Sequence, residues 1–259
     1  MENILKALEL AQVNKQKVDD VAPANAEPAT PNENIVYSSS RVVEMDPTTL
    51  RKNRVIVGME PGPVTDAYRL LRTQVLQRMR ENNWNTLAIV SPTSHAGKCL
   101  TAVNLAVSMA MEVNQTVLLV DLDLRNPHVH TYFDYVPEKG ISDFLKHGTP
   151  LNEIMFNPSI ERLVVLPGRE RMHNSSETLS APKMVSLVEE LKTRYPGRFV
   201  LFNLPPFLTT DDVLAFSPYV DAVLLVVEEG KTTSDELVQA KSLLQTVNII
   251  GTVLNKGRA

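Results

Sequence analysis

Apolar and polar positions follow a regular pattern after about residue 63 of the chain and an irregular one before it. The regular part contains short apolar runs rich in Val, Ile, Leu and Phe, which are typical of buried β-strands. The runs are Leu87–Val90, Val117–Val120, Leu163–Leu166, Phe199–Phe202, Ala222–Val227 and Ile249–Leu254. Because strands that are apolar on both faces occur in parallel sheets covered by helices on each side, the pattern predicts an α/β fold.

Segments with helical spacing of apolar residues lie among these runs, near residues 64–80, 98–113, 182–194 and 232–246. Parallel strands require such crossover connections, because the chain must return to the same end of the sheet. We therefore predict one domain over residues 63–259, with a mostly parallel sheet and helices on both of its faces.

The first 17 residues place Ile4, Leu5, Leu8 and Ala11 at helical spacing, which predicts a short amphipathic helix. An isolated helix of this length is marginal in water, so its apolar stripe would dock on a partner, on the domain or on a membrane surface. A frayed terminus is the alternative. Residues 18–62 are rich in Ala, Pro, Asn, Glu and Ser and cannot bury much apolar surface, so we predict a disordered linker there.

The charge balance argues against a nucleic-acid partner. Twenty-six Lys and Arg residues against 30 Asp and Glu residues give a formal net charge of -4, so any binding of phosphate groups has to be local. The chain has one cysteine, which excludes an intrachain disulfide, and no apolar run approaches the roughly 18 residues of a membrane span. A cytoplasmic protein is expected.

The strand at Leu87–Val90 leads into the sequence Ser-Pro-Thr-Ser-His-Ala-Gly-Lys-Cys of residues 91–99 and then into a predicted helix. This is the context of a P-loop, in which a turn at a helix N-terminus directs several backbone N–H groups at one phosphate and a lysine adds positive charge. A Gly-Lys pair after a strand also arises by chance, so the motif alone is weak. The predicted nucleotide-binding residues are His95, Ala96, Gly97, Lys98, Cys99 and Leu100.

Polar side chains follow two further strands. Asp121 and Asp123 come just after the second run, and Asn203 follows the fourth, at the strand ends where ligands bind in open α/β sheets. A metal-side carboxylate is expected at the end of the fourth run, where Asn203 stands. The alternative for Asp121 and Asp123 is a pair of solvated residues at a strand end.

Further segments appear in a characteristic order. They are Asp66-Ala-Tyr-Arg69-Leu-Leu-Arg72, Asn104-Leu105-Ala106, Asp121–Phe133 and Asn174-Ser-Ser-Glu177-Thr-Leu179-Ser180. Together with the loop, these segments resemble the bacterial tyrosine kinases of exopolysaccharide and capsule biosynthesis, which belong to the partition and septum-site group of P-loop ATPases. The resemblance covers about residues 60–256.

The resemblance implies ATP and Mg²⁺ as cofactors and a membrane-bound chain-length (copolymerase) protein as partner, at the inner face of the membrane. It implies that Lys98 clamps the phosphates, that Asp121 activates the attacking hydroxyl or holds metal through water, and that Asp123 assists. The metal positions that it implies are Cys99, Asp121 and Asn203. Asp66, Arg69 and Arg72 would mediate oligomerisation from one helix face, although a solvated helix face is the alternative.

The chain departs from the family pattern where the chemistry lies. Cys99 stands where the family has Ser or Thr, and a thiol is a poor ligand for Mg²⁺, which prefers oxygen. Asn203 stands in place of an Asp and brings no negative charge. His95 replaces a loop glycine, and because a positive φ is unfavourable for a residue with a side chain, we expect the loop geometry to differ from that of the family. We expect Mg²⁺ binding to be weak or lost.

Three functions remain open. The first is an ATP-dependent protein tyrosine kinase; since no tyrosine follows Tyr219, self-phosphorylation on a tyrosine-rich tail, as in the family, is not expected. The second is a catalytically dead pseudokinase that serves as an adaptor, which the altered metal positions favour. The third is a partition-type positioning ATPase, which Pro92 argues against because those proteins carry a signature lysine at that position.

Overall fold

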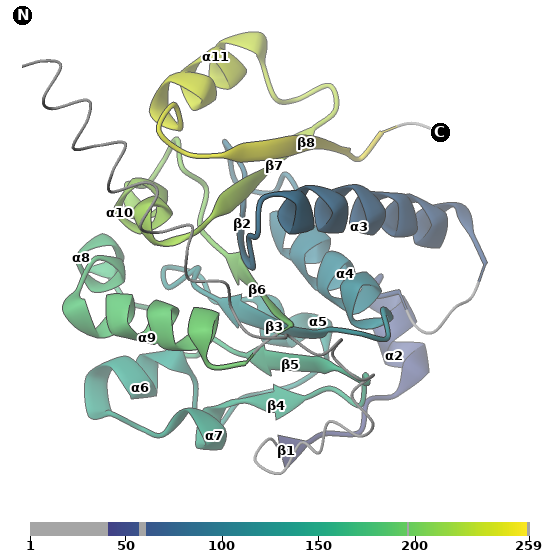
Figure 1. The fold of residues 1–259 in the computed structure, drawn as a ribbon, viewed down its shortest axis with the longest axis vertical. Coiled ribbons are helices and arrows are strands. Elements are labelled where there is room, and N and C mark those ends of the chain that lie inside the picture. Colours follow the sequence, from purple (N-terminus) through teal and green to yellow (C-terminus); the bar gives the residue numbers. More distant parts are fainter. Residues whose placement is uncertain (1–40, 57–60, 196, 258–259) are drawn as a thin grey trace, which may run out of the picture. The chain divides into compact units, whose positions relative to one another are not determined.

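The protein is described by a computed structural model over residues 41–56, 61–195 and 197–257. Within these residues, eight strands form one sheet in the order β1-β4-β5-β3-β6-β2-β7-β8 (Figure 1). All neighbouring strands are parallel except β4 and β5, which are antiparallel. The predicted α/β fold with a mostly parallel sheet is confirmed. The predicted helix of residues 1–17 lies outside the described residues.

The six predicted strands are all present, and two short ones were not predicted. The strands are β1 Arg41–Val42, β2 Thr86–Val90, β3 Thr116–Asp121, β4 Phe156–Asn157, β5 Leu163–Leu166, β6 Arg198–Asn203, β7 Ala222–Glu228 and β8 Ile249–Asn255. Strands β1 and β4 have two residues each, too few to produce a pattern in the sequence.

The four predicted helices are also present, as α3, α4, α9 and α11. The helices are α2 Pro47–Lys52, α3 Pro63–Glu81, α4 Lys98–Ala110, α5 Val129–Tyr132, α6 Ile141–His147, α7 Leu151–Ile154, α8 Ser175–Leu179, α9 Pro182–Thr193, α10 Asp212–Phe216 and α11 Ser234–Leu243, with a 3₁₀ turn at Ser217–Tyr219. The remaining helices have seven residues or fewer, which is two turns at most.

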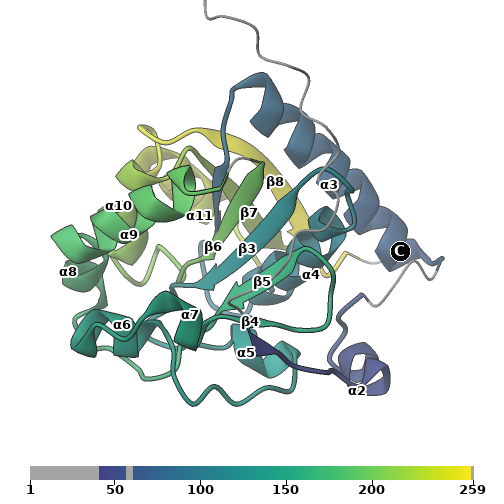
Figure 2. The ribbon, with the colours of Figure 1, turned by 60° about the horizontal axis from the view of Figure 1, so that its bottom comes forward.

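Helices cover both faces of the sheet (Figures 1 and 2). Alternate residues of β2 show the two layers: Leu87 and Ile89 pack in one apolar core with α3 and α4, whereas Ala88 and Val90 pack in another with α9 and α10. This burial on both faces explains why the strand runs are continuously apolar rather than alternating.

The prediction of a disordered linker over residues 18–62 is wrong for residues 41–56. Strand β1 pairs with β4, Asp46 caps α2 by accepting hydrogen bonds from the N–H groups of Thr48 and Thr49, and Leu50, Val55 and Ile56 are buried. The polar composition of the segment gave no sign of these three apolar residues, which are part of the apolar core of the domain. The rest of the predicted linker, except residues 61 and 62, lies outside the described residues.

The topology brings three strand ends together. Strands β3, β6 and β2 are neighbours in the middle of the sheet and run parallel. The segments after Asp121, Asn203 and Val90 therefore lie together along one edge of the sheet, the one formed by the carboxyl ends of the strands. Asp121 and Asn203 are direct partners in the register of β3 and β6. This edge holds the candidate site.

Candidate nucleotide-binding site

The loop of residues 91–97 connects β2 to α4. Gly97 adopts a left-handed conformation with φ of 94° directly before Lys98, the first residue of α4. His95 also has a positive φ, 66°. Ala96 is fully buried and Leu100 lies in the first turn of α4. The N–H groups of that first turn have no acceptor earlier in the helix, which favours an anion at this point.

Lys98, which directly follows this loop, forms a buried ion pair with Asp123. Its Nζ lies 2.7 Å from Oδ2 of Asp123, with side-chain exposures of 9% and 7%, and 3.5 Å from Sγ of Cys99. Burial favours the neutral amine, but the negative charge of Asp123 in direct contact opposes it; the pKa of Lys98 is raised and its ammonium group stays charged. Burial also raises the pKa of Cys99, which keeps the thiol protonated at neutral pH. Asp123 is therefore the anionic partner of Lys98.

Asp121 lies behind this pair, and both of its carboxylate oxygens are engaged. Oδ2 accepts hydrogen bonds from the backbone N–H groups of His128, at 2.8 Å, and Val129, at 2.9 Å. Oδ1 accepts from Nδ2 of Asn203 at 2.9 Å and from the N–H of Asp123 at 3.3 Å. Burial raises the pKa of the fully buried Asp121. In this arrangement Asp121 anchors the turn that follows β3.

The three candidate metal positions come together, but their donors do not fit Mg²⁺. Cys99 offers a protonated thiol, Asp121 has no uncommitted oxygen, and Oδ1 of the buried Asn203 is left without a hydrogen-bond partner among the described residues. The described part of the chain contains no group of three or more His, Cys, Asp or Glu side chains that could hold a metal ion. One amide oxygen is a poor substitute for the carboxylates that Mg²⁺ prefers.

The predicted oligomerisation residues lie on α3, and each has a partner within the chain. Arg69 forms an ion pair with Asp66 at 3.0 Å. Arg72 donates to the carbonyl of Ser108 at 3.1 Å and lies 3.3 Å from a carboxylate oxygen of Glu112, so its side chain is only 15% exposed. Arg72 therefore ties α3 to α4.

Among the residues that contact the loop without having been predicted are two at the carboxyl end of β8. Nδ2 of Asn255 donates to the carbonyl of Ala96 at 2.8 Å, and Nζ of Lys256 donates to the carbonyl of His95 at 2.8 Å. They follow the loop by about 160 positions. No local signal marks such a contact, although their place at the carboxyl end of a parallel strand could have suggested it.

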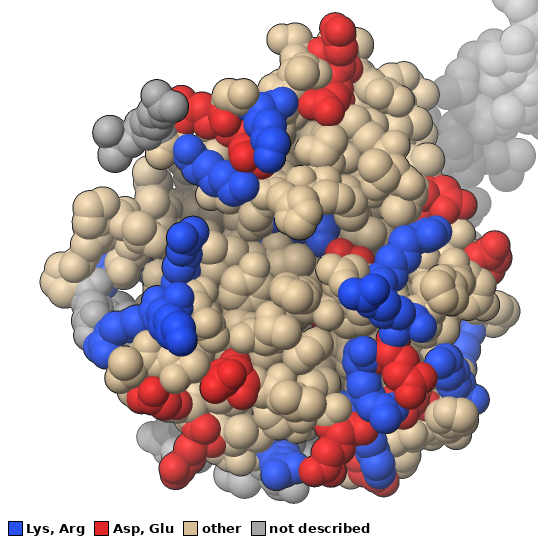
Figure 3. Space-filling view, turned by 180° about the vertical axis from the view of Figure 1, so that it is seen from behind, with Lys and Arg blue, Asp and Glu red and all other residues tan. Residues whose placement is uncertain are grey.

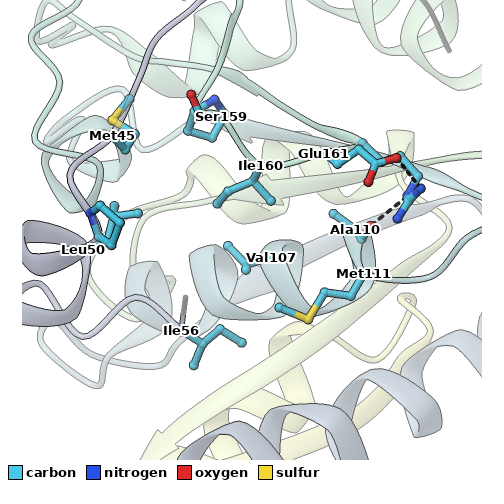
Figure 4. Close-up of a pocket in the computed structure, with 12 residues that line it drawn as sticks. Met45, Leu50, Ile56, Val107, Ala110, Met111, Ser159, Ile160 and Glu161 are labelled. Atoms are coloured by element: carbon cyan, nitrogen blue, oxygen red, sulfur yellow. Dashed lines mark hydrogen bonds and ion pairs between the residues drawn. The ribbon is translucent and has the colours of Figure 1, made fainter. Parts of the chain in front are cut away.

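An apolar cavity of about 380 Å³ lies away from this site, between α2, the end of α4 and the loop before β5 (Figure 4). Its lining includes Leu50, Val107 and Ile160 and contains none of the predicted nucleotide-binding residues.

Figure 3 shows the face opposite the view of Figure 1, where Lys and Arg side chains are mixed with Asp and Glu around a largely uncharged centre. This mixture agrees with the lack of a basic field. In the described part of the chain, no helix is long and apolar enough to cross a membrane.

Residues 87–259 match the CbiA family, described as the CobQ/CobB/MinD/ParA nucleotide binding domain. The chain is 29% identical over 195 residues to the putative tyrosine-protein kinase CapB of Staphylococcus aureus, covering 74% of this chain and 84% of CapB. It is 31% identical over 216 residues to the tyrosine-protein kinase YwqD of Bacillus subtilis, covering 80% and 90%. The crystal structure of the chimerical protein CapA2B2 is similar with a TM-score of 0.73 and 25% identity, over 85% of this chain and 94% of that one.

Proposed function

The chain belongs to the bacterial tyrosine-protein kinases with a CobQ/CobB/MinD/ParA nucleotide-binding domain, and from this premise we propose that it binds ATP at residues 95–100 and acts in exopolysaccharide assembly. The observation that carries the proposal is the buried, charged Lys98 directly after the left-handed Gly97. A positive group and a helix N-terminus at one point favour a polyphosphate.

Nucleotide binding then involves an exchange of partners at Lys98. In the structure its ammonium group forms an ion pair with Asp123 at 2.7 Å. An incoming β- or γ-phosphate competes with Asp123 for the same charge, while the first turn of α4 supplies backbone donors. Asp123 is therefore the anion that a phosphate would have to displace from Lys98.

A pseudokinase that serves as an adaptor is the second candidate, and the metal side of the site favours it. Phosphoryl transfer relies on Mg²⁺ to neutralise the developing charge, and the donors at Cys99, Asp121 and Asn203 do not fit this ion. Under this candidate the chain binds nucleotide and passes its binding state to a partner without transferring the phosphoryl group. A partition-type ATPase is a third, weaker candidate.

The proposed partner is a membrane-bound chain-length (copolymerase) protein, as the family resemblance implies. It would bring the chain to the inner face of the cell membrane. Oligomerisation through α3 is part of the proposal, with Asp66 and Arg69, which pair with each other in the chain, as the residues that would face a neighbouring subunit. Arg72 already serves an internal contact and is a weaker candidate for that surface.

Calorimetric titration of the full chain with ATP and ADP, each with and without Mg²⁺, tests nucleotide binding. We expect binding in all four titrations, with little gain from Mg²⁺. The exposed Lys139, which pairs with Glu153 far from the loop in sequence, provides the matched control: Lys139→Met should bind as the wild type does, whereas Lys98→Met should not. A wild type that binds neither nucleotide would refute the proposal.

A phosphorylation assay on the proposed partner separates the two main candidates. A kinase incorporates labelled γ-phosphate into tyrosine of the partner's cytoplasmic segment, and this incorporation is lost in Lys98→Met. A pseudokinase shows no incorporation while still binding nucleotide. Turnover of ATP that requires no partner would instead favour the positioning ATPase.

A further inference from the structure

The carboxyl end of β8 reaches across to the loop that precedes α4. Asn255, the last residue of β8, and Lys256, which follows it, donate hydrogen bonds of 2.8 Å to the carbonyls of Ala96 and His95. We propose that Asn255 and Lys256 are positioning residues that set the direction of the loop's phosphate-binding N–H groups. This inference rests on the proposed nucleotide binding and deepens it.

The geometry of the peptide bond connects the two carbonyls to the phosphate. In a planar trans peptide the C=O of one residue and the N–H of the next point in opposite directions. No cis peptide bond occurs among the described residues. When β8 holds the carbonyls of His95 and Ala96, it therefore also turns the N–H groups of Ala96 and Gly97 away from β8. Those two N–H groups belong to the turn that enters α4, where a phosphate would bind.

Close packing makes this orientation specific. A Cβ atom added at Gly97 would lie 1.9 Å from Nδ2 of Asn255, so the amide group sits directly against the α-carbon of Gly97. The positive φ of Gly97 excludes ordinary side chains independently of this contact. Only a glycine at this position lets Asn255 reach the carbonyl of Ala96.

The second donor, Lys256, binds a residue with an unfavourable backbone conformation, His95. A non-glycine residue at φ of 66° is held in an unfavourable region of backbone space, which costs about 1–2 kcal/mol without compensation. Lys256 compensates by binding the carbonyl of His95 while its ammonium group also pairs with Glu228 at 3.1 Å. Because the Lys256 side chain is 46% exposed, its effect should be smaller than that of Asn255.

Asn255 is the last residue of strand β8, which is paired with β7. Asn255 is paired with Glu228 in the parallel ladder of β7 and β8, and its own carbonyl accepts from the N–H of Glu229 at 3.0 Å. A side chain on such a strand loses little freedom when it binds the loop. Preorganising the loop in this way lowers the entropic cost of nucleotide binding.

The experiment compares two variants with two matched controls from the same part of the fold. Asn248, just before β8, donates to the carbonyl of Asp221 at 2.9 Å and does not contact the loop. Lys231 lies 3.5 Å from Glu228, the carboxylate that Lys256 also binds. Asn255→Ala is therefore measured beside Asn248→Ala, and Lys256→Met beside Lys231→Met.

Titration with ADP should show affinity losses of roughly tenfold for Asn255→Ala and about threefold for Lys256→Met, as expected for one lost hydrogen bond in each. Asn255→Asp should lose at least as much as Asn255→Ala, because a carboxylate keeps the size of the amide but cannot donate. Both controls should bind within about twofold of the wild type. Wild-type affinity in Asn255→Asp would overturn the proposal.

Hydrogen exchange on the nucleotide-free protein tests the same contacts without a ligand. The peptide covering residues 91–98 should exchange several times faster in Asn255→Ala than in the wild type, with no change in Asn248→Ala and no comparable change in the peptides of β3 or β6. If exchange in this peptide is unchanged, the positioning role is refuted. A wild type that binds no ADP while Asn255→Ala still accelerates exchange would refute nucleotide binding and leave the loop contact supported.

Discussion

The phosphate side of the site is built from backbone groups and one lysine, whereas its metal side would depend entirely on side chains. On the phosphate side, the left-handed Gly97 and the buried Lys98 are in place, and His95 has a positive φ as Gly97 does. On the metal side, Cys99 and Asn203 remove the hard, charged oxygens, and Asp121 is committed to hydrogen bonds. Backbone chemistry tolerates substitution, but a metal site loses its ligands with its side chains.

The largest effect is expected from Lys98→Met, which removes the only side-chain charge that we assign to the phosphates. Nucleotide affinity should fall by at least about 100-fold, and the unpaired, buried Asp123 should lower the free energy of unfolding by about 3 kcal/mol. Titration with ADP and urea denaturation measure the two effects.

Asp123→Asn in the Lys98→Met background separates these effects. The second change removes the unpaired charge, so stability should largely recover while nucleotide affinity stays low. If affinity recovers together with stability, Lys98 acts on the fold and not on the phosphates.

Gly97→Ala tests whether the phosphate side depends on the backbone. The added Cβ meets Nδ2 of Asn255 and the residue must keep a positive φ, so we expect a loss of about 2 kcal/mol in the free energy of unfolding. In an Asn255→Gly background the clash is absent and the same change should cost only about 1 kcal/mol. Equal costs in the two backgrounds would show that the loop and β8 are not coupled.

Cys99→Ser with Asn203→Asp should restore part of the metal side. Without Mg²⁺ the new carboxylate replaces the amide that donates to Asp121 at 2.9 Å, so repulsion should lower stability by about 2 kcal/mol. Millimolar Mg²⁺ should recover much of that loss and increase ADP affinity about tenfold. Thermal unfolding with and without Mg²⁺ measures this, and a double variant that ignores Mg²⁺ would show that further ligands are missing.

The smallest effect is expected outside the site, at Asp221. Its carboxylate accepts hydrogen bonds from the N–H groups of Asn85 and Thr86, each at 3.0 Å, and pairs with Lys192. Burial opposes the charge, but Lys192 and these donors lower the pKa of Asp221 below its ordinary value of 3.8. A lowered folded pKa stabilises the protein above pH 3.8, and this stabilisation is lost as the pH falls through the folded pKa.

Asp221→Asn should therefore cost about 1 kcal/mol at pH 7 and progressively less below about pH 4. Urea denaturation at several pH values measures the difference, and nucleotide affinity at pH 7 should be unchanged. A cost that stays constant down to pH 3 would show that the charge of Asp221 is not what stabilises this part of the sheet.

The sequence predicted those parts of the structure that depend on local pattern. Continuous apolar runs identified the six longer strands, and their parallel order placed Lys98, Asp121, Asp123 and Asn203 at one edge. Residues 41–56 were mistaken for linker because Leu50 and its neighbours become ordered only by packing on the domain.

Contacts between distant segments could not be predicted in the same way. The spacing of Asp66, Arg69 and Arg72 placed them on one helix face, but the contact of Arg72 with Ser108 depends on how α3 and α4 pack. The contacts of Asn255 and Lys256 with the loop depend on the tertiary fold and on hydrogen bonds made to the backbone, which leave no side-chain pattern to recognise.

The most direct test of the difference between the two sides is the affinity of the wild-type chain for ADP, measured by calorimetry with Mg²⁺ and again with a chelator. Because the phosphate side acts through backbone groups and Lys98, we predict binding in both conditions, with dissociation constants that differ by less than about threefold. Binding that strengthens more than tenfold with Mg²⁺, or that disappears in the chelator, would contradict the account and show that Cys99, Asp121 and Asn203 still form a working metal site.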